Sequence, residues 1–174
     1  LCDEPAMRGY RFLTAKPILY VWNVAETVMD SFEVPADGLG QMHMSVSARL
    51  ERELAAIADP EERAMFLTDL GLTESALDKV ISRTYKLLGL MSFLTAGDKE
   101  VRSWPVRVGA TAPESAGVIH TDFQKGFIRA EVIGYQDFLR AGDFKKAKEL
   151  GLARLEGKEY IVQDGDIIEF RFNV

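Results

Sequence analysis

The first clear pattern along the chain is a continuous apolar run that begins at Pro17 and stops at Asn23. Such a run is typical of a parallel strand buried on both faces, and a proline is tolerated at the first position of a strand. We therefore predict a strand over 17–23. Residues 42–48 predict a second strand, and the glycine- and proline-rich segment 35–40 predicts a loop between them.

Helical periodicity replaces the strand pattern after the second run, with apolar residues three and four positions apart. Asp59 before Pro60 is a typical helix cap followed by a proline in the first turn, while Gly71 and Gly89 are typical helix ends. The expected helices are a short one over 27–33 and three longer ones over 49–58, 60–70 and 74–88, the last capped by Thr73.

Shorter segments with alternating character follow Gly89. Residues 127–133 alternate apolar and polar positions, which predicts a strand with one buried face. Asp164-Gly165 predicts a tight turn between two strands. The expected elements are strands 90–96 and 100–108 joined at Gly97-Asp98, helix 112–119, strand 127–133, helices 135–142 and 143–151, and strands 159–162 and 167–172. This order predicts an α+β chain whose second half is a small mixed sheet around a helix, a β-grasp (ubiquitin-like) fold.

Composition and charge narrow the classes of function. The chain has 174 residues, 47% of them hydrophobic and 28% charged, which is ordinary for a globular protein. No apolar stretch reaches the length of a membrane span, and one cysteine excludes an internal disulfide framework. The net charge of −6 argues against a broad basic surface for nucleic acid. We expect a monomeric, cytoplasmic protein without a membrane segment.

Two polar elements stand where the two predicted strands of the first half end. The first is Asn23-Val24-Ala25-Glu26 and the second is Ser47-Ala48-Arg49. GTPases with a phosphate loop read the base with Asn-Lys-x-Asp at one strand end and Ser-Ala-Lys at the next. The order and placement match here, but Val24 replaces the lysine and Glu26 replaces the aspartate.

With these departures the chain resembles the YchF-type Obg-like ATPases. The runs that carry the resemblance are FLTAKPILYVWNVAE, VSARLE, GVIHTDFQKGFIRAEVI and LEGKEYIVQDGDIIEFRFNV, and it extends over nearly all of the sequence. The resemblance implies that residues 1–89 are the end of a nucleotide-binding domain with connecting helices. It implies that residues 90–174 are a TGS domain of β-grasp type, which this family uses for RNA or ribosome contact.

The resemblance also implies what the intact protein does. It would bind ATP or GTP with Mg²⁺ and hydrolyse ATP, and the phosphate loop would precede residue 1. The sequence itself contains no Gly-x-x-x-x-Gly-Lys-Ser/Thr segment. This chain alone is therefore not expected to hydrolyse a nucleotide or to hold one tightly.

The hydrogen-bonding groups of guanine and adenine indicate how Val24 and Glu26 would change base recognition. Guanine presents two adjacent donors that an aspartate accepts together, whereas adenine presents an acceptor there, so the longer Glu26 predicts relaxed or adenine-directed reading. We expect the amide of Asn23 to pair with the N6/N7 edge of adenine. Val24 and the N–H of Ala48 would complete the base site beside Ser47. In the alternative reading Asn23 is a turn residue, Ser47 only a helix cap and Glu26 a solvated residue of a first helical turn.

The second half shows no catalytic constellation: a triad at His120 would need Ser115 or Thr121 as its nucleophile, and the alternative is a loop whose polar side chains bond nearby backbone groups. Six cations there are candidate RNA contacts: Lys125, Arg129, Arg140, Lys145, Lys146 and Lys148. The alternative is an ordinary solvated helix surface. Trp104 and Phe123 are the aromatic residues most expected to be exposed. A second function remains open, a stand-alone β-grasp module that binds a protein or RNA while the nucleotide elements only pack.

Overall fold

The computed structural model describes residues 12–13, 16–29, 31–33, 42–97 and 100–173. Helices and strands are mixed, as the α+β prediction required. The chain divides into two compact units, 1–88 and 89–174, and each is described by itself. Cys2, the predicted loop 35–40 and Asp98 of the predicted turn lie outside the described residues.

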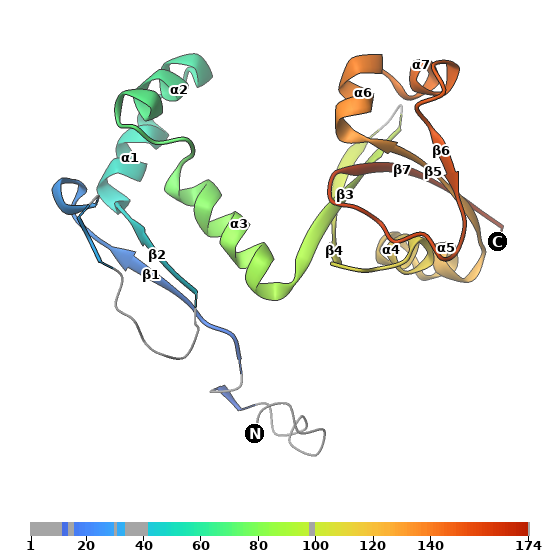
Figure 1. The fold of residues 1–174 in the computed structure, drawn as a ribbon, viewed down its shortest axis with the longest axis horizontal. Helices are drawn as coiled ribbons and strands as arrows, with labels where there is room; N and C mark the ends of the chain where they lie inside the picture. Colours follow the sequence, from blue (N-terminus) through green and yellow to red (C-terminus); the bar gives the residue numbers. More distant parts are fainter. Residues whose placement is uncertain (1–11, 14–15, 30, 34–41, 98–99, 174) are drawn as a thin grey trace. The chain divides into compact units, whose positions relative to one another are not determined.

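A two-stranded parallel sheet organises the first unit (Figure 1). Strand β1 (Leu19–Asn23) pairs with β2 (Met42–Val46), and Asn23 lies opposite Val46. Parallel pairing brings the carboxyl ends of both strands to one edge. The short helix predicted over 27–33 is wrong: a single 3-10 turn, η3 (Glu26–Val28), follows β1. Its cap residue is Ala25, which has no side chain to accept a hydrogen bond from the first turn.

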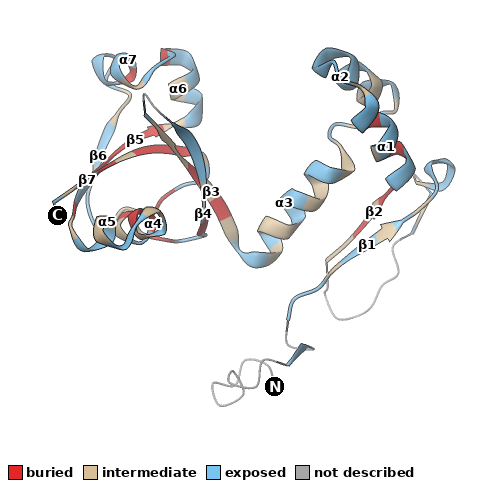
Figure 2. Ribbon diagram, turned by 180° about the vertical axis from the view of Figure 1, so that it is seen from behind, coloured by how far each residue is buried: buried red, intermediate tan, exposed pale blue. Residues whose placement is uncertain are grey.

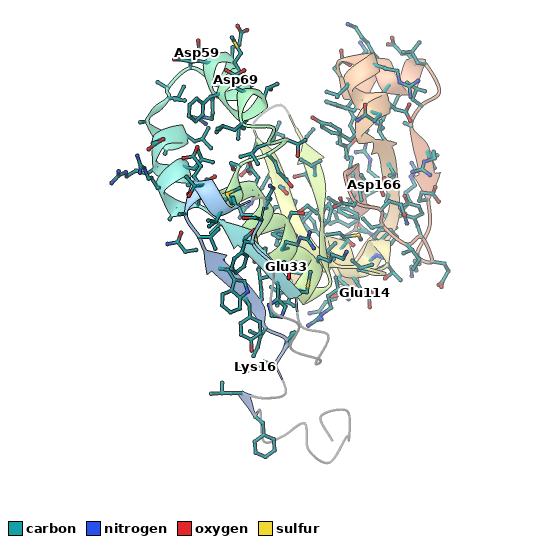
Figure 3. All side chains as sticks on the ribbon, turned by 60° about the vertical axis from the view of Figure 1, so that its left-hand side comes forward. Lys16, Glu33, Asp59, Asp69, Glu114 and Asp166 are labelled. Atoms are coloured by element: carbon teal, nitrogen blue, oxygen red, sulfur yellow. The ribbon has the colours of Figure 1, made fainter. Side chains whose placement is uncertain are left out.

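Three helices follow β2: α1 (Ala48–Ala56), α2 (Pro60–Asp69) and α3 (Ala76–Leu88). The predicted cap Asp59 is confirmed, because its side chain accepts from the N–H of Glu61 at the start of α2 (Figure 3). The predicted cap of the third helix is wrong by two residues. Ser75, not Thr73, accepts from the N–H of Asp78 at 3.0 Å.

Apolar burial in the first unit is concentrated in β2 and α1. Four apolar residues from β2 and α1 are buried: Met44, Val46, Leu50 and Leu54. On β1, Tyr20 and Val21 are exposed (Figure 2). The ring of Tyr20 stacks on His43 at 4.8 Å between centroids, and Trp22 Nε1 lies 3.3 Å from His43 Nδ1. His43 therefore has a structural role between the two strands of this sheet.

The second unit is built on a five-stranded mixed sheet with the order β4-β3-β7-β5-β6. The strands are β3 (Leu90–Ala96), β4 (Val101–Arg107), β5 (Phe127–Gly134), β6 (Arg154–Glu156) and β7 (Asp166–Phe172). Neighbouring strands are antiparallel except the central pair, β3 and β7. The sheet therefore places the first and last strands of the unit side by side.

Helices cover both faces of this sheet (Figure 1). They are α4 (Ala112–Ile119), α5 (Thr121–Lys125), α6 (Tyr135–Ala141) and α7 (Phe144–Glu149). The main apolar core joins Ala112 and Ala116 of α4 to Phe93 and Val132 of the sheet. A smaller core packs α6 and α7 around Ile133, which faces the other way because successive strand residues alternate. Among the described residues no helix is long and apolar enough to cross a membrane.

Two predictions for this unit need correction. The strand predicted over 159–162 is wrong, because only Ile161 forms a bridge there, with Thr111, and the edge strand β6 lies earlier. Tyr160 in this segment packs on the core, and its hydroxyl donates to Asp166 at 2.7 Å, so the segment is held by side chains. The short helix α5 was not predicted. His120, read as a loop residue, caps it through Nδ1, which accepts from Asp122 N–H at 3.2 Å.

Candidate nucleotide-base site

The two polar elements at the strand ends of the first unit meet in the structure. Asn23 Oδ1 accepts a hydrogen bond from the backbone N–H of Ala48 at 3.1 Å. The next backbone N–H, of Val24, donates to the carbonyl of Val46 at 2.9 Å. Because β1 and β2 are parallel and in register, residues far apart in sequence are fixed beside each other at one sheet edge.

A cavity of about 400 Å³ lies at this edge. Its volume falls in the range of small-molecule sites, roughly 300–1,000 Å³. The lining residues are Asn23, Val24, Ala25, Glu26, Thr27, Ser47 and Arg49. Four of the five predicted site residues belong to this lining, and the fifth, Ala48, contacts Asn23 through its N–H.

Three lining residues were absent from the predicted site. Ala25 lies inside the four-residue first element and Thr27 directly follows it, so both could have been inferred from their position next to Glu26. Arg49 completes the Ser-Ala-Arg element, and its position next to Ala48 could have identified it. Its guanidinium pairs with Glu53 at 3.2 Å, one helical turn further along α1.

The second element owes its position to a helix start. Ser47 is the cap of α1, and its buried hydroxyl accepts from the N–H of Leu50 at 3.4 Å. The capping role considered for Ser47 is therefore present. Glu26 begins η3 and is exposed, as expected for an acidic residue in a first helical turn. Both residues still border the cavity.

The contact between Asn23 and Ala48 decides which groups remain for a ligand. An N–H donor requires an oxygen partner, so the amide of Asn23 has its oxygen toward Ala48. The amide NH₂ of Asn23 is left to donate, which suits an acceptor such as purine N7. The Ala48 N–H is already engaged, and a guanine O6 would have to compete for it.

The six candidate RNA contacts lie on four elements, α5, β5, α6 and α7. Three of them pair with carboxylates of the same unit. Arg140 contacts Asp137 at 2.6 Å and Lys146 contacts Asp143 at 3.8 Å. Arg129 lies opposite Arg171 across the β5–β7 register.

Lys148 has a structural role. Its ammonium contacts Glu131, a carboxylate on β5 that is only 8% exposed, and Arg171 Nε approaches the same carboxylate at 3.1 Å. The hydrogen bond from Lys148 lowers the pKa of Glu131, and that same bond raises the pKa of Lys148. The three side chains hold α7 against the sheet, so Lys148 is less available to an external anion than Lys125 or Lys145.

The aromatic residues expected to be exposed and His120 all make contacts within the second unit. Trp104 and Phe123 are half-buried, with Trp104 Nε1 donating to Thr95 Oγ1 at 3.0 Å and Phe123 stacked on Phe172 at 3.8 Å. His120 is occupied as the α5 cap. Within the described residues, no three His, Cys, Asp or Glu side chains are grouped to hold a metal ion.

Comparison with known proteins decides the family. A family model described as "YchF-GTPase_C: Protein of unknown function (DUF933)" matches residues 90–173. A curated relative from Haemophilus ducreyi, named "Ribosome-binding ATPase YchF", is 53% identical over 178 residues, covering 97% of this chain and 48% of the relative. One from Bacillus subtilis with the same name is 50% identical over 181 residues, covering 99% and 49%. The chain belongs to the YchF family.

Solved structures agree with the YchF assignment. The Schizosaccharomyces pombe YchF GTPase matches with a TM-score of 0.73 and 32% identity, over 91% of this chain and 44% of that one. A GTP binding protein from Pyrococcus horikoshii matches with a TM-score of 0.57 over 91% and 46%, and at 21% identity it supports the fold alone. The chain spans about half the length of the curated YchF relatives it matches.

Proposed function

We propose that this chain supplies the base-reading edge and a TGS domain of a YchF-type ATPase. In this proposal the intact protein binds ATP in preference to GTP, hydrolyses it with Mg²⁺ and contacts the ribosome. The relatives named "Ribosome-binding ATPase YchF" support the activity and the partner. The observation that carries the proposal is the hydrogen bond between Asn23 and Ala48 at a cavity of suitable size.

The preference for adenine rests on three groups at the cavity. Val24 stands where a GTPase has a lysine, so no cation from that position reaches the base. Glu26 is one methylene longer than the aspartate that accepts both guanine donors. The Ala48 N–H, the natural donor to guanine O6 at this position, already bonds to Asn23 at 3.1 Å. Each of these weakens a guanine-specific contact, whereas purine N7 remains readable by the amide of Asn23.

The second unit supports the TGS part of the proposal. Its strand order, β4-β3-β7-β5-β6, places parallel first and last strands at the centre, with α4 against one face. A β-grasp domain requires this order. The paired state of Arg140, Lys146 and Lys148 leaves Lys125, Arg129 and Lys145 as the cations we propose for ribosomal RNA contact.

Hydrolysis is assigned to the intact protein. The 174 residues contain no Gly-x-x-x-x-Gly-Lys-Ser/Thr segment, so the triphosphate and Mg²⁺ contacts must come from elsewhere in a YchF chain of about twice this length. This chain contributes the sheet edge that contacts the base. Its own residues orient the purine but do not act on the phosphates.

Titration of the intact YchF protein with fluorescent ATP and GTP analogues tests the proposal. Asn23→Ala removes the amide that bonds to Ala48 and to the base, and we expect at least a tenfold loss of ATP affinity, roughly 1.4 kcal/mol. Asn173→Ala is the matched control, since it changes the other asparagine of the chain at an exposed position. Tighter GTP than ATP binding would overturn the base preference, and equal affinity of the Asn23 variant would overturn the site.

A further inference from the structure

The carboxylate of Glu51 joins two helices of the first unit. It lies on α1 and accepts hydrogen bonds from the backbone N–H groups of Ala76, at 2.5 Å, and Leu77, at 3.3 Å. These two residues begin α3, and 25 and 26 positions separate them from Glu51. The first N–H groups of a helix have no partner within that helix, so this distant carboxylate takes the place of a local cap.

The next N–H groups of α3 are satisfied by a residue beside them. The hydroxyl of Ser75 accepts from the N–H of Asp78 at 3.0 Å, and the carbonyl of Ser75 accepts from the N–H of Lys79 at 3.1 Å. Ser75 thus takes the third and fourth N–H groups of the helix, and Glu51 takes the first and second. The helix dipole also favours a carboxylate at this place. Glu51 is therefore a specific anchor between α1 and α3.

The same turn of α1 forms part of the base cavity. Ser47 lines that cavity, and the N–H of Ala48 donates to Asn23 Oδ1 at 3.1 Å. Glu51 lies three positions after Ala48, and its own N–H donates to the carbonyl of Ser47 at 3.0 Å. Leu50, between them, is buried, and its N–H donates to Ser47 Oγ. The first turn of α1 is therefore held as one block, with Asn23 at one end and α3 at the other.

The orientation of the Asn23 amide depends on the position of this turn. While the Ala48 N–H is within reach, the amide oxygen is turned toward it, and the NH₂ group is left to donate to purine N7. If the turn moves away, the amide is free to flip, and the Ala48 N–H becomes available to guanine O6. Loss of the N7 contact weakens the binding of both purines, but only guanine gains the O6 contact. A displaced α1 therefore lowers the preference for adenine.

We propose that Glu51 is a positioning residue for base recognition, through which α3 holds the start of α1 in the geometry that favours adenine. This rests on the proposed function, since it needs a purine in the cavity of the first unit. Glu51 itself does not line that cavity, so it acts through α1. Coupling between two sites is reciprocal, so a purine that fixes Asn23 and Ala48 also stabilises the first turn of α3.

Titration of the intact YchF protein with fluorescent ATP and GTP analogues tests the positioning role. Glu51→Ala removes both acceptor oxygens from the start of α3, and we expect the ratio of ATP affinity to GTP affinity to fall about fivefold. Glu51→Gln keeps one acceptor oxygen and should hold the ratio within about twofold of the unchanged protein. Glu62→Ala, at an exposed glutamate in the first turn of α2, is the matched control and should leave the ratio unchanged.

Hydrogen exchange at the amides of Ala76 and Leu77 tests the coupling without any variant. At saturating concentrations, ATP should slow exchange at these amides of the intact protein about fivefold more than inorganic tripolyphosphate, which carries the phosphates without the base. The amide of Glu61, bonded to Asp59 at the start of α2, is the internal control and should respond equally to both ligands. This measurement decides the question even if Glu51→Ala does not fold.

The possible results separate the positioning role from the proposed function. If the unchanged protein binds GTP as tightly as ATP, or if Asn23→Ala binds ATP normally, the proposed function fails and the positioning role fails with it. If Asn23→Ala loses affinity but Glu51→Ala lowers ATP and GTP affinity equally, Glu51 only stabilises the unit and the positioning role alone is overturned. Equal slowing of the Ala76 and Leu77 amides by ATP and tripolyphosphate would overturn it as well.

Discussion

The two units of this chain are stabilised in different ways. Among the described residues, the second unit encloses a core in which Phe93, Val132, Ile133 and Ile168 are at most 1% exposed. The described part of the first unit buries four apolar residues, Met44, Val46, Leu50 and Leu54, and its strand β1 carries exposed apolar residues. Parallel strands are normally covered on both faces. We therefore expect the first unit to depend more on hydrogen bonds at element ends than the second unit does.

This difference matters for the candidate base site. The base cavity is formed where two strands end and a helix begins, so its geometry is set by backbone bonds such as that of Val24 with Val46. In the second unit side-chain packing fixes the aromatic residues instead, with Trp104 donating to Thr95 and Phe123 stacked on Phe172.

The largest expected effect comes from cutting into the second core. Phe93→Ala removes a fully buried ring that packs against Phe170 and should cost about 3–5 kcal/mol of unfolding free energy. Met44→Ala, in the apolar cluster of β2 and α1 in the first unit, should leave the second unit unchanged. Urea titration followed by Trp104 fluorescence in a Trp22→Phe background measures this. A loss below about 1 kcal/mol for the Phe93 variant would contradict the comparison.

The hydrogen bond between Tyr160 and Asp166 makes the stability of the second unit depend on pH. Tyr160 donates to the buried Asp166 at 2.7 Å, and burial followed by this hydrogen bond raises the pKa of Tyr160 to about 12. The folded pKa lies above the ordinary value near 10, so this contribution to stability is present below pH 10 and is lost as the pH rises toward 12. We expect the unfolding free energy to fall over that window.

Tyr160→Phe should remove that part of the alkaline loss and cost about 1–2 kcal/mol at neutral pH, because Asp166 loses a donor. Tyr135→Phe, at an exposed ring, is the matched control. Denaturant titrations between pH 8 and 12 compare the three proteins. An unchanged alkaline slope in the Tyr160 variant would mean that another group is responsible.

Local signals predicted many elements correctly from sequence. Strand 90–96 is confirmed to the residue, and the Asp59-Pro60 start of α2 is confirmed with its cap bond. These features depend on a few adjacent residues. The strand predicted over 159–162 failed because Tyr160 and Val162 are apolar for a tertiary reason, packing of a loop on the core, and not for strand pairing.

The candidate base site was also predictable only in part. The sequence placed Asn23 and Ser47-Ala48 at two strand ends, and the structure brings them together. It could not reveal that the Ala48 N–H is engaged by Asn23, because this depends on the strand register. Their roles in base reading stay a prediction. The pairing of Lys148 with Glu131 was also invisible, since 17 positions separate the two residues.

A smaller effect tests whether hydrogen bonds hold the first unit. Glu51 on α1 accepts from the first N–H groups of α3, those of Ala76 at 2.5 Å and Leu77 at 3.3 Å. A carboxylate at a helix start is favourable, and Glu51→Ala should cost about 1 kcal/mol. Hydrogen exchange at the first turn of α3 should accelerate about fivefold, corresponding to that free energy.

The matched control for this bond is Glu53→Ala on the same helix, whose carboxylate contacts only the exposed Arg49 among the described side chains. An exposed pair of this kind contributes at most about 0.5 kcal/mol. Exchange in α3 should therefore stay near its original rate. Equal acceleration by both variants would show that general loss of α1 helicity, not the bond to α3, sets the rate.

The smallest expected effect is a gain in stability in the second unit. Ser115 on α4 is fully buried, and its Oγ has no hydrogen-bond partner in the described part of the chain. Ser115→Ala removes this desolvated hydroxyl and raises helix propensity, so the unfolding free energy should rise by about 0.5–1 kcal/mol. The reverse change at its buried neighbour, Ala116→Ser, should lower it by about 1–3 kcal/mol. Thermal unfolding of both variants measures the pair, and a loss on Ser115→Ala would show that the hydroxyl is bonded in solution and that this core is less apolar than its packing indicates.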